Sequence, residues 1–87
     1  MHVRFSRQFK KDYQKVDKKI KSNFESRLEL FLKNPFNPQL NNHALTGKYK
    51  SYRSINITGD WRALYSVNKK NGEVIFESIG THSQLYK

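Results

Sequence analysis

The spacing of apolar residues changes near Pro35, from a helical period before it to strand-like alternation after it. Before this point, apolar side chains recur every three or four residues, at Phe5, Phe9, Tyr13, Val16, Ile20, Phe24, Leu28, Phe31 and Leu32. This spacing is typical of one helix face, with Lys and Arg on the other. We predict two helices, or one bent helix, ending at Asn34 and Pro35, because proline lacks a backbone donor and restricts the residue before it.

Polar residues mark where these helices are expected to begin. Ser6 stands just before the first helical segment, and Asp17 is placed to cap a second helix within the same stripe. Residues 2–5 alternate between polar and apolar side chains, which predicts a short first strand with its apolar side inward.

Alternation predicts three further strands in the second half of the chain. They are expected at Tyr52–Ile57, Trp61–Val67 and Glu73–Thr81. Gly59-Asp60 is interpreted as a tight connection between the first two strands. Asn71-Gly72 is the strongest short hairpin signal, since both residues accept a positive φ, so the last two strands should be antiparallel.

The order of the elements is one strand, a helical segment and three antiparallel strands. This order indicates an α+β sandwich of two layers, and the length suits one domain over residues 1–87. Pro35–Asn42 is expected to be a loop in which Phe36 and Leu40 anchor the chain on the core. Leu85 and Tyr86 should form a turn of helix or a final strand.

Positive charge favours a polyanionic partner. Seventeen Lys and Arg residues against seven Asp and Glu give a formal charge of +10, which suits RNA or an acidic protein. The lysines between Lys10 and Lys21 could contact phosphates, but we prefer a solvated helix face. The chain has no cysteine, no signal-like apolar start and no stretch of membrane-spanning length, so we expect a cytoplasmic protein without membrane contact.

Common catalytic motifs are missing from the sequence. The three histidines stand far apart without an acidic cluster, so we expect no metal site and no cofactor. The chain has no Gly-rich phosphate loop and no serine on a nucleophile elbow. The polar residues on the predicted strands therefore remain as the candidate site.

RNA can be cut without a metal when the ribose 2′-oxygen attacks the adjacent phosphate. This reaction needs a base, an acid for the leaving 5′-oxygen, and cations for the phosphorane. Histidine suits either proton-transfer role, and the sequence leaves open which histidine is the base. Arg62, Lys48, Lys50 and Arg53 are candidates for phosphate binding, and Trp61 and Tyr86 for stacking on a splayed base.

Four separated blocks resemble the RelE and ParE superfamily of bacterial toxins, most closely its YafQ branch. The blocks are Asn42–Gly47, Tyr52-Arg53, Gly59–Tyr65 and Gly80–Tyr86, in the same order as in that branch. The resemblance implies a RelE-like microbial ribonuclease fold, with an N-terminal strand and two helices on a small twisted, mainly antiparallel sheet. It also implies a ribosome-dependent endoribonuclease that cuts messenger RNA in the decoding site and is silenced by a cognate antitoxin.

The same resemblance implies which residues take part in catalysis. Four residues fall on positions linked with cleavage: His43, Asp60, His82 and Tyr86. Asp60 would orient a nearby imidazole, and Arg62 falls where other RelE-type branches place a catalytic arginine. Asn56 departs from the pattern, because the YafQ branch usually has a histidine there and an amide cannot exchange a proton near neutral pH. We therefore expect either slower cleavage or proton transfer by His43 and His82 alone.

Two other functions fit the same scaffold. One is a ParE-like toxin that poisons DNA gyrase by protein contact, a branch that needs no histidines. The other is an RNA-binding or antitoxin-binding relative whose catalysis is weakened at Asn56. Both the mRNA-cutting toxin and the ParE-like toxin are expected to have an acidic, partly disordered antitoxin. A segment that orders on binding can cover a large cationic surface.

Overall fold

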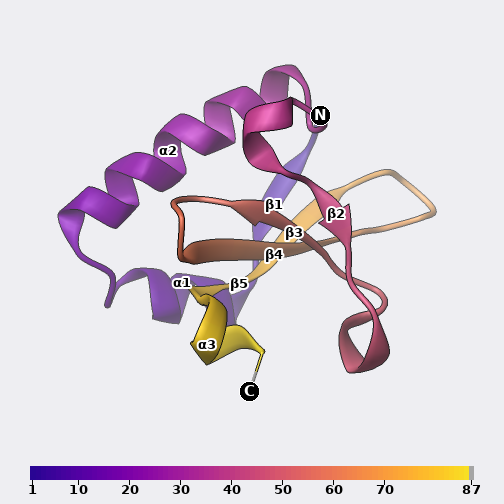
Figure 1. Cartoon of the computed structure of the whole chain (residues 1–87). Helices are drawn as coiled ribbons and strands as arrows, with labels where there is room; N and C mark the ends of the chain where they lie inside the picture. Colours follow the sequence, from indigo (N-terminus) through magenta and orange to yellow (C-terminus); the bar gives the residue numbers. More distant parts are fainter. Residues whose placement is uncertain (87) are drawn as a thin grey trace.

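Five strands and three helices make up the part of the chain that the computed structural model describes, residues 1–86. The strands are β1 (Val3–Phe5), β2 (His43–Ala44), β3 (Arg53–Asn56), β4 (Trp61–Val67) and β5 (Val74–Thr81). The helices are α1 (Arg7–Tyr13), α2 (Lys18–Lys33) and the one-turn α3 (His82–Leu85), with 3-10 turns η1 (Pro38–Leu40) and η2 (Gly47–Tyr49). The strands form one sheet in the order β1-β5-β4-β3-β2, and α1 and α2 lie together to one side of it (Figure 1). The predicted α+β fold is therefore confirmed.

Both predicted helix starts are confirmed. The Ser6 hydroxyl accepts a hydrogen bond of 3.0 Å from the backbone N–H of Phe9, and the Asp17 carboxylate accepts one of 2.9 Å from Ile20. Each cap satisfies a backbone donor that has no partner within its helix. The apolar stripe is thus divided between two separate helices, and Tyr13 ends the first.

The core lies between these helices and the sheet, around the buried ring of Phe76. Five aromatic rings have their centroids 5.5 to 6.0 Å from that of Phe76: Phe5, Phe9, Phe24, Phe31 and Tyr65. Leu40 is fully buried as predicted, whereas Phe36 is 63% exposed. The prediction that Phe36 anchors the loop on the core was wrong, because its ring packs instead under the guanidinium of Arg53, 5.3 Å away.

The sheet is antiparallel except at β1, which pairs in parallel with β5. The strand β2 was not predicted, since it has only two residues and is defined by its pairing with β3. Strand β5 carries a bulge at Glu77, because Leu64 pairs with Ser78 while the next residue, Tyr65, pairs with Phe76. The alternation predicted for β4 holds at Ala63 and Tyr65, which lie in the core. It fails at Leu64, which is also buried, and at Val67, which is 45% exposed.

The β4–β5 hairpin differs from the prediction in its turn. The backbone N–H of Asn68 donates to the carbonyl of Glu73 at 2.8 Å, so the loop between this pair is longer than the two residues of an Asn-Gly turn. Gly72 has a φ of +74°, but Asn71 does not share the left-handed conformation. The predicted antiparallel pairing is confirmed, but in this longer loop only the last residue takes a positive φ.

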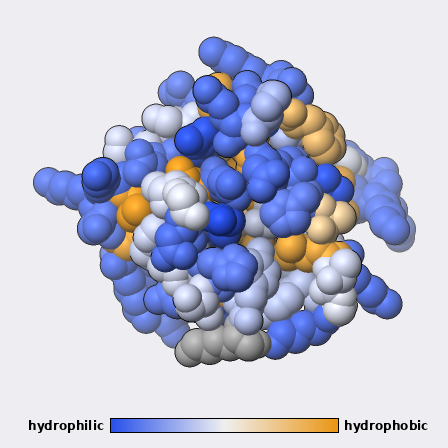
Figure 2. All heavy atoms as spheres, viewed as in Figure 1, coloured by the Kyte–Doolittle hydropathy of each residue, from blue (hydrophilic) through white to orange (hydrophobic). Residues whose placement is uncertain are grey.

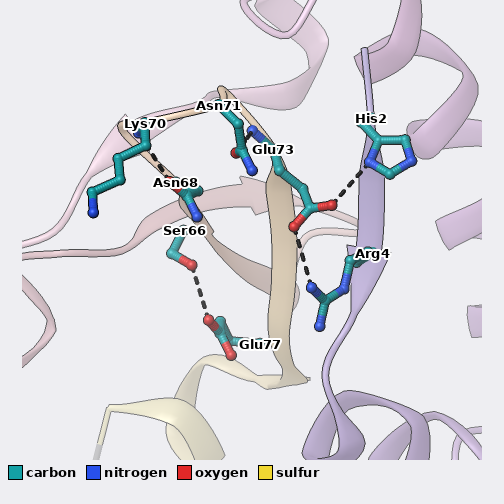
Figure 3. Close-up of polar contacts among 8 residues, drawn as sticks. All are labelled: His2, Arg4, Ser66, Asn68, Lys70, Asn71, Glu73 and Glu77. Carbon is teal, nitrogen blue, oxygen red and sulfur yellow. Dashed lines mark hydrogen bonds and ion pairs between the residues drawn. The ribbon is translucent and has the colours of Figure 1, made fainter.

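A polar cluster joins the first strand to this hairpin, and Figure 3 shows its members. The carboxylate of Glu73 accepts hydrogen bonds from Nδ1 of His2 at 2.9 Å and from Arg4 at 3.2 Å. The same view shows the hydroxyl of Ser66 donating to the Glu77 carboxylate at 2.9 Å. Exposed pairs of this kind contribute at most about 1 kcal/mol each, so the cluster stabilises the edge of the sheet only modestly.

The pKa of Tyr13 lies above its ordinary value of 10.0, because the side chain is partly buried and Glu25 is nearby. The folded protein therefore holds this proton more tightly than the unfolded chain. The stabilisation is fully present below the ordinary pKa and is lost as the pH rises through the raised pKa.

We expect Tyr13→Phe to weaken the pH dependence of stability in alkaline solution. Urea unfolding at roughly pH 9 and pH 11 should show a smaller loss in free energy of unfolding for the variant than for the wild type, because phenylalanine has no proton to lose. Equal losses in the two proteins would contradict the assignment.

Candidate active site

Polar residues gather on the sheet face opposite the core. Residues paired on neighbouring strands share a face. His43 of β2 pairs with Ser54 of β3, and one row further on Asn56 pairs with Arg62 of β4, which pairs with Gly80 of β5. Ile55 and Ala63, which alternate with these residues on β3 and β4, belong to the core. The candidate site therefore lies on the side of the sheet away from the aromatic core.

A cavity of about 310 Å³ opens on this face. Its lining consists of Asn41, His43, Leu45, Arg62, His82 and Tyr86. Four of the five predicted catalytic residues therefore meet at one hollow, although they come from β2, β4 and the C-terminal segment around α3. None of the lining residues is acidic, so the hollow favours an anionic ligand.

The conformation of His43 is fixed by the loop before it. Nδ1 of its exposed ring lies 2.8 Å from the backbone oxygen of Asn41. A carbonyl oxygen only accepts, so Nδ1 is the protonated nitrogen and Nε2 of the neutral ring keeps its lone pair. Asn41 has a φ of +48° and is the only residue other than glycine with a positive φ in the described part of the chain. Asparagine tolerates this left-handed backbone better than most residues.

His82 is placed by the first turn of α3. The Thr81 hydroxyl and the Gln84 side chain form a capping box, with hydrogen bonds of 3.3 and 2.9 Å. The backbone N–H of His82 donates to the carbonyl of Asp60 at 2.9 Å. Gly80 lets the helix approach the sheet, since a Cβ there would lie 3.1 Å from the Gln84 side chain.

Asp60 acts on this site through its backbone. Its carboxylate is exposed on the β3–β4 connection and forms no ion pair with a histidine within residues 1–86. The ring of His82 instead packs edge-on against Tyr86, with the two centroids 4.7 Å apart. Tyr86 therefore orients the imidazole, a role that the sequence assigned to Asp60.

Arg62 both holds the β3–β4 connection and faces the cavity. Its Nη1 donates to three backbone carbonyls, those of Thr58, Gly59 and Trp61, at 3.0 to 3.1 Å. No hydrogen bond from Nε or Nη2 to residues 1–86 is present. These two nitrogens are therefore available to a phosphate, and the bonds of Nη1 limit the motion of the group.

The residues predicted to bind RNA divide between the two sides of the sheet. Lys48 and Lys50 are exposed in and beside η2, which follows the cavity-lining Leu45. Arg53 points to the other side, where its Nε donates to the side-chain oxygen of Asn42 at 2.8 Å. Trp61 packs against the core and lines a different cavity of about 380 Å³. The two lysines thus belong to the connection that begins at the cavity, whereas Arg53 and Trp61 lie on the other side of the sheet.

Two buried oxygens lie on the cavity side of the sheet without a partner. They are Oγ of Ser54 and Oδ1 of Asn56, for which residues 1–86 provide no hydrogen bond. A buried acceptor left in this state costs about 1–3 kcal/mol. Asn56 does not line the cavity, although it pairs with the cavity-lining Arg62 on the neighbouring strand.

Sequence reasoning missed three residues of the site. Asn41 and Leu45 line the cavity, and Tyr49 contacts its C-terminal wall. The adjacent asparagines before His43 were a local signal for a left-handed residue. Leu45 and Tyr49 gave no such signal, because their contacts are made only when the β2–β3 connection folds against α3.

The surface around these elements is mainly hydrophilic. Figure 2 shows polar side chains over most of the face seen in Figure 1, with small separate apolar patches. Within residues 1–86, no group of three or more His, Cys, Asp or Glu side chains is arranged to hold a metal ion. The helices described for this chain include none with the length and apolar character needed to cross a membrane.

Known proteins with similar sequence and structure are bacterial toxins. A sequence profile of the family described as "Bacterial toxin of type II toxin-antitoxin system, YafQ" matches residues 1–87. The mRNA interferase toxin YafQ of Escherichia coli K12 is 28% identical, over 97% of this chain and 94% of the relative. A crystal structure of YafQ from E. coli BL21(DE3) matches with a TM-score of 0.82 and 25% identity, over 98% of this chain and 97% of that one. YafQ in the E. coli DinJ–YafQ toxin–antitoxin complex matches with a TM-score of 0.78 and 25% identity, over 98% and 96% of the two chains.

Proposed function

The chain belongs to the YafQ family of bacterial toxins of type II toxin–antitoxin systems, and from this premise we propose that it is an endoribonuclease that cuts messenger RNA on the ribosome. The observation that carries the proposal is the convergence of His43, Arg62 and His82 on one open cavity with no acidic lining. Two imidazoles and a guanidinium supply the base, the acid and the cation that 2′-oxygen attack requires.

We assign the base to His43. Its Nδ1 hydrogen is held by the carbonyl of Asn41, so the lone pair on Nε2 can take the proton of the ribose 2′-hydroxyl. The 2′-oxygen then forms a bond to the adjacent phosphorus. The bond from phosphorus to the 5′-oxygen breaks, which leaves a 2′,3′-cyclic phosphate on one fragment.

His82 is then the acid, because it is the second imidazole of the cavity and Asn56 cannot transfer a proton near neutral pH. Its protonated ring gives a proton to the departing 5′-oxygen, which becomes a 5′-hydroxyl. Tyr86 keeps the ring oriented by edge-on packing. Nε and Nη2 of Arg62 stabilise the negative charge on the phosphorane oxygens, a contribution typically worth about 10²- to 10³-fold in rate.

The exposed lysines extend the binding surface beyond the reacting phosphate. Lys48 and Lys50 belong to the connection beside the cavity, where they can contact neighbouring phosphates of the message. Asp60 contributes by holding the backbone of His82. We assign no contact with RNA at this cavity to Arg53 and Trp61, since both lie on the helix side of the sheet.

A cognate antitoxin is the second partner we propose. The E. coli relative is known in a complex with the antitoxin DinJ, and a formal charge of +10 on this chain suits an acidic, partly disordered segment. The target of the toxin, translated mRNA, places the activity in the cytoplasm.

The test is a short pulse of expression followed by sequencing of RNA 5′ ends. We expect growth arrest and new 5′-hydroxyl ends within the codons of translated messages. A reporter transcript without a start codon should remain intact, because its codons do not enter the decoding site. DNA damage with intact mRNA would instead indicate a gyrase poison. RNA binding with a steep salt dependence but no cleavage would indicate a binding protein.

A further inference from the structure

We propose that Tyr49, in the β2–β3 connection, is a positioning residue that sets where His82 and Tyr86 stand relative to His43. The kinetic part of this inference rests on the proposed function, whereas its structural part does not. No role was predicted for Tyr49, and this residue lies outside the cavity lining.

The hydroxyl of Tyr49 ties the end of α3 to the β2–β3 connection. It donates a hydrogen bond of 2.7 Å to the backbone carbonyl of Leu85, the last residue of the helix. The final carbonyls of a helix have no partner within it, and a single turn is too short to be stable alone. Tyr49 therefore supplies from outside a bond that α3 cannot make for itself.

The ring of Tyr49 is linked to the ring of His82 through Tyr86. It packs edge-on against Tyr86 with the centroids 5.9 Å apart, and Tyr86 packs against His82 at 4.7 Å. The ammonium of Lys48 lies 5.2 Å from the Tyr49 centroid, which holds the ring from its own connection. A displacement of Tyr49 would thus reach His82 through one intervening ring.

The two histidines depend on such a link because they come from separate elements. His43 lies on the two-residue edge strand β2, and His82 begins the C-terminal turn. Within residues 1–86, the Tyr49 hydroxyl makes the one hydrogen bond that joins the β2–β3 connection to α3. A misplacement of about 1 Å between reacting groups can reduce a rate about 10²-fold.

The experiment compares Tyr49→Phe and Tyr49→Ala with Tyr13→Phe as the matched control. Tyr13 also donates its hydroxyl to a backbone carbonyl, that of Lys21 at 3.2 Å, but on the helix side of the molecule. Single-turnover cleavage is measured on ribosomes carrying a short synthetic mRNA, and amide exchange of the α3 segment is measured on the free protein.

Tyr49→Phe keeps the ring and removes only the hydrogen bond, so we expect the cleavage rate to fall roughly 5- to 10-fold. Tyr49→Ala should reduce it about 100-fold, with the half-saturating ribosome concentration unchanged in both. Amide exchange of Leu85 and Tyr86 should be faster in both variants. Tyr13→Phe should match the wild type in rate and in exchange of this segment.

Unchanged exchange and unchanged His82 ring signals in nuclear magnetic resonance spectra of both variants would overturn the inference, whether or not the protein cuts RNA. A raised half-saturating concentration with an unchanged rate would also overturn it, because Tyr49 would then contact the RNA. If the wild type cuts no RNA but exchange is faster in Tyr49→Phe, the positioning role stands and the proposed function fails. Should Tyr49→Ala not fold, Tyr49→Phe alone decides.

Discussion

Replacing His43 with alanine is expected to slow cleavage of ribosome-bound mRNA by about 10²- to 10⁴-fold, the usual contribution of a general base. The expectation depends on one contact, the Nδ1 hydrogen bond to Asn41 that leaves Nε2 free to accept a proton. Single-turnover cleavage on ribosomes carrying a short synthetic mRNA measures the loss.

Two further variants make the result specific. His2→Ala changes an exposed histidine that pairs with Glu73 far from the cavity, and it should cut mRNA at the wild-type rate. His82→Ala should also slow cleavage strongly, because the departing 5′-oxygen then lacks its proton donor. A His43→Ala protein with the wild-type rate would show that another group is the base. Toxicity that persists after both histidines are replaced, with DNA damage, would point to gyrase.

Phe76→Ala is expected to reduce the free energy of unfolding by about 3–5 kcal/mol, the cost typical of truncating a buried phenylalanine. Domains are commonly stable by only about 5–15 kcal/mol, and a domain of 87 residues lies toward the low end, so much of the protein should be unfolded at growth temperature. Phe76 is 0% exposed, and it joins β5 to aromatic side chains of β1, α1, α2 and β4. Urea unfolding followed by circular dichroism gives the change directly.

Phe36→Ala is the matched control, since it makes the same truncation where the ring is 63% exposed. Its stability should fall by less than about 1 kcal/mol, through the lost contact with Arg53. Phe76→Ala should lose toxicity together with its folded signal, whereas His43→Ala should lose toxicity and keep that signal. Similar stabilities for the two phenylalanine variants would contradict the position of Phe76 at the centre of the core.

The parts of the fold that depend on local sequence were predictable. Helix caps at Ser6 and Asp17 act within one turn, and the period of apolar residues reports which face of each element is buried. The strand β2, the exposed position of Phe36 and the longer hairpin loop depend on contacts between distant segments. No local pattern records such contacts, which is why these features were missed or wrong.

The candidate site could likewise be predicted only in part. The resemblance identified His43, Arg62, His82 and Tyr86, and the structure brings them to one cavity. Which side of the sheet a strand residue faces depends on pairing register, and Arg53 lies one residue from Ser54, which pairs with the cavity-lining His43. The left-handed backbone of Asn41, which fixes the ring of His43, is likewise a property of the folded loop.

The parallel pairing of Val3 with Val74 has a consequence for how the protein reaches its native state. Helices and hairpins bring together neighbours in the chain and form early, whereas joining distant segments has a larger entropic cost and is slower. Strand β1 can dock only after β5 exists, and its Phe5 then closes one side of the aromatic cluster. Refolding is therefore expected to be limited by this late docking step, and the chain should acquire its full stability only when that step is complete.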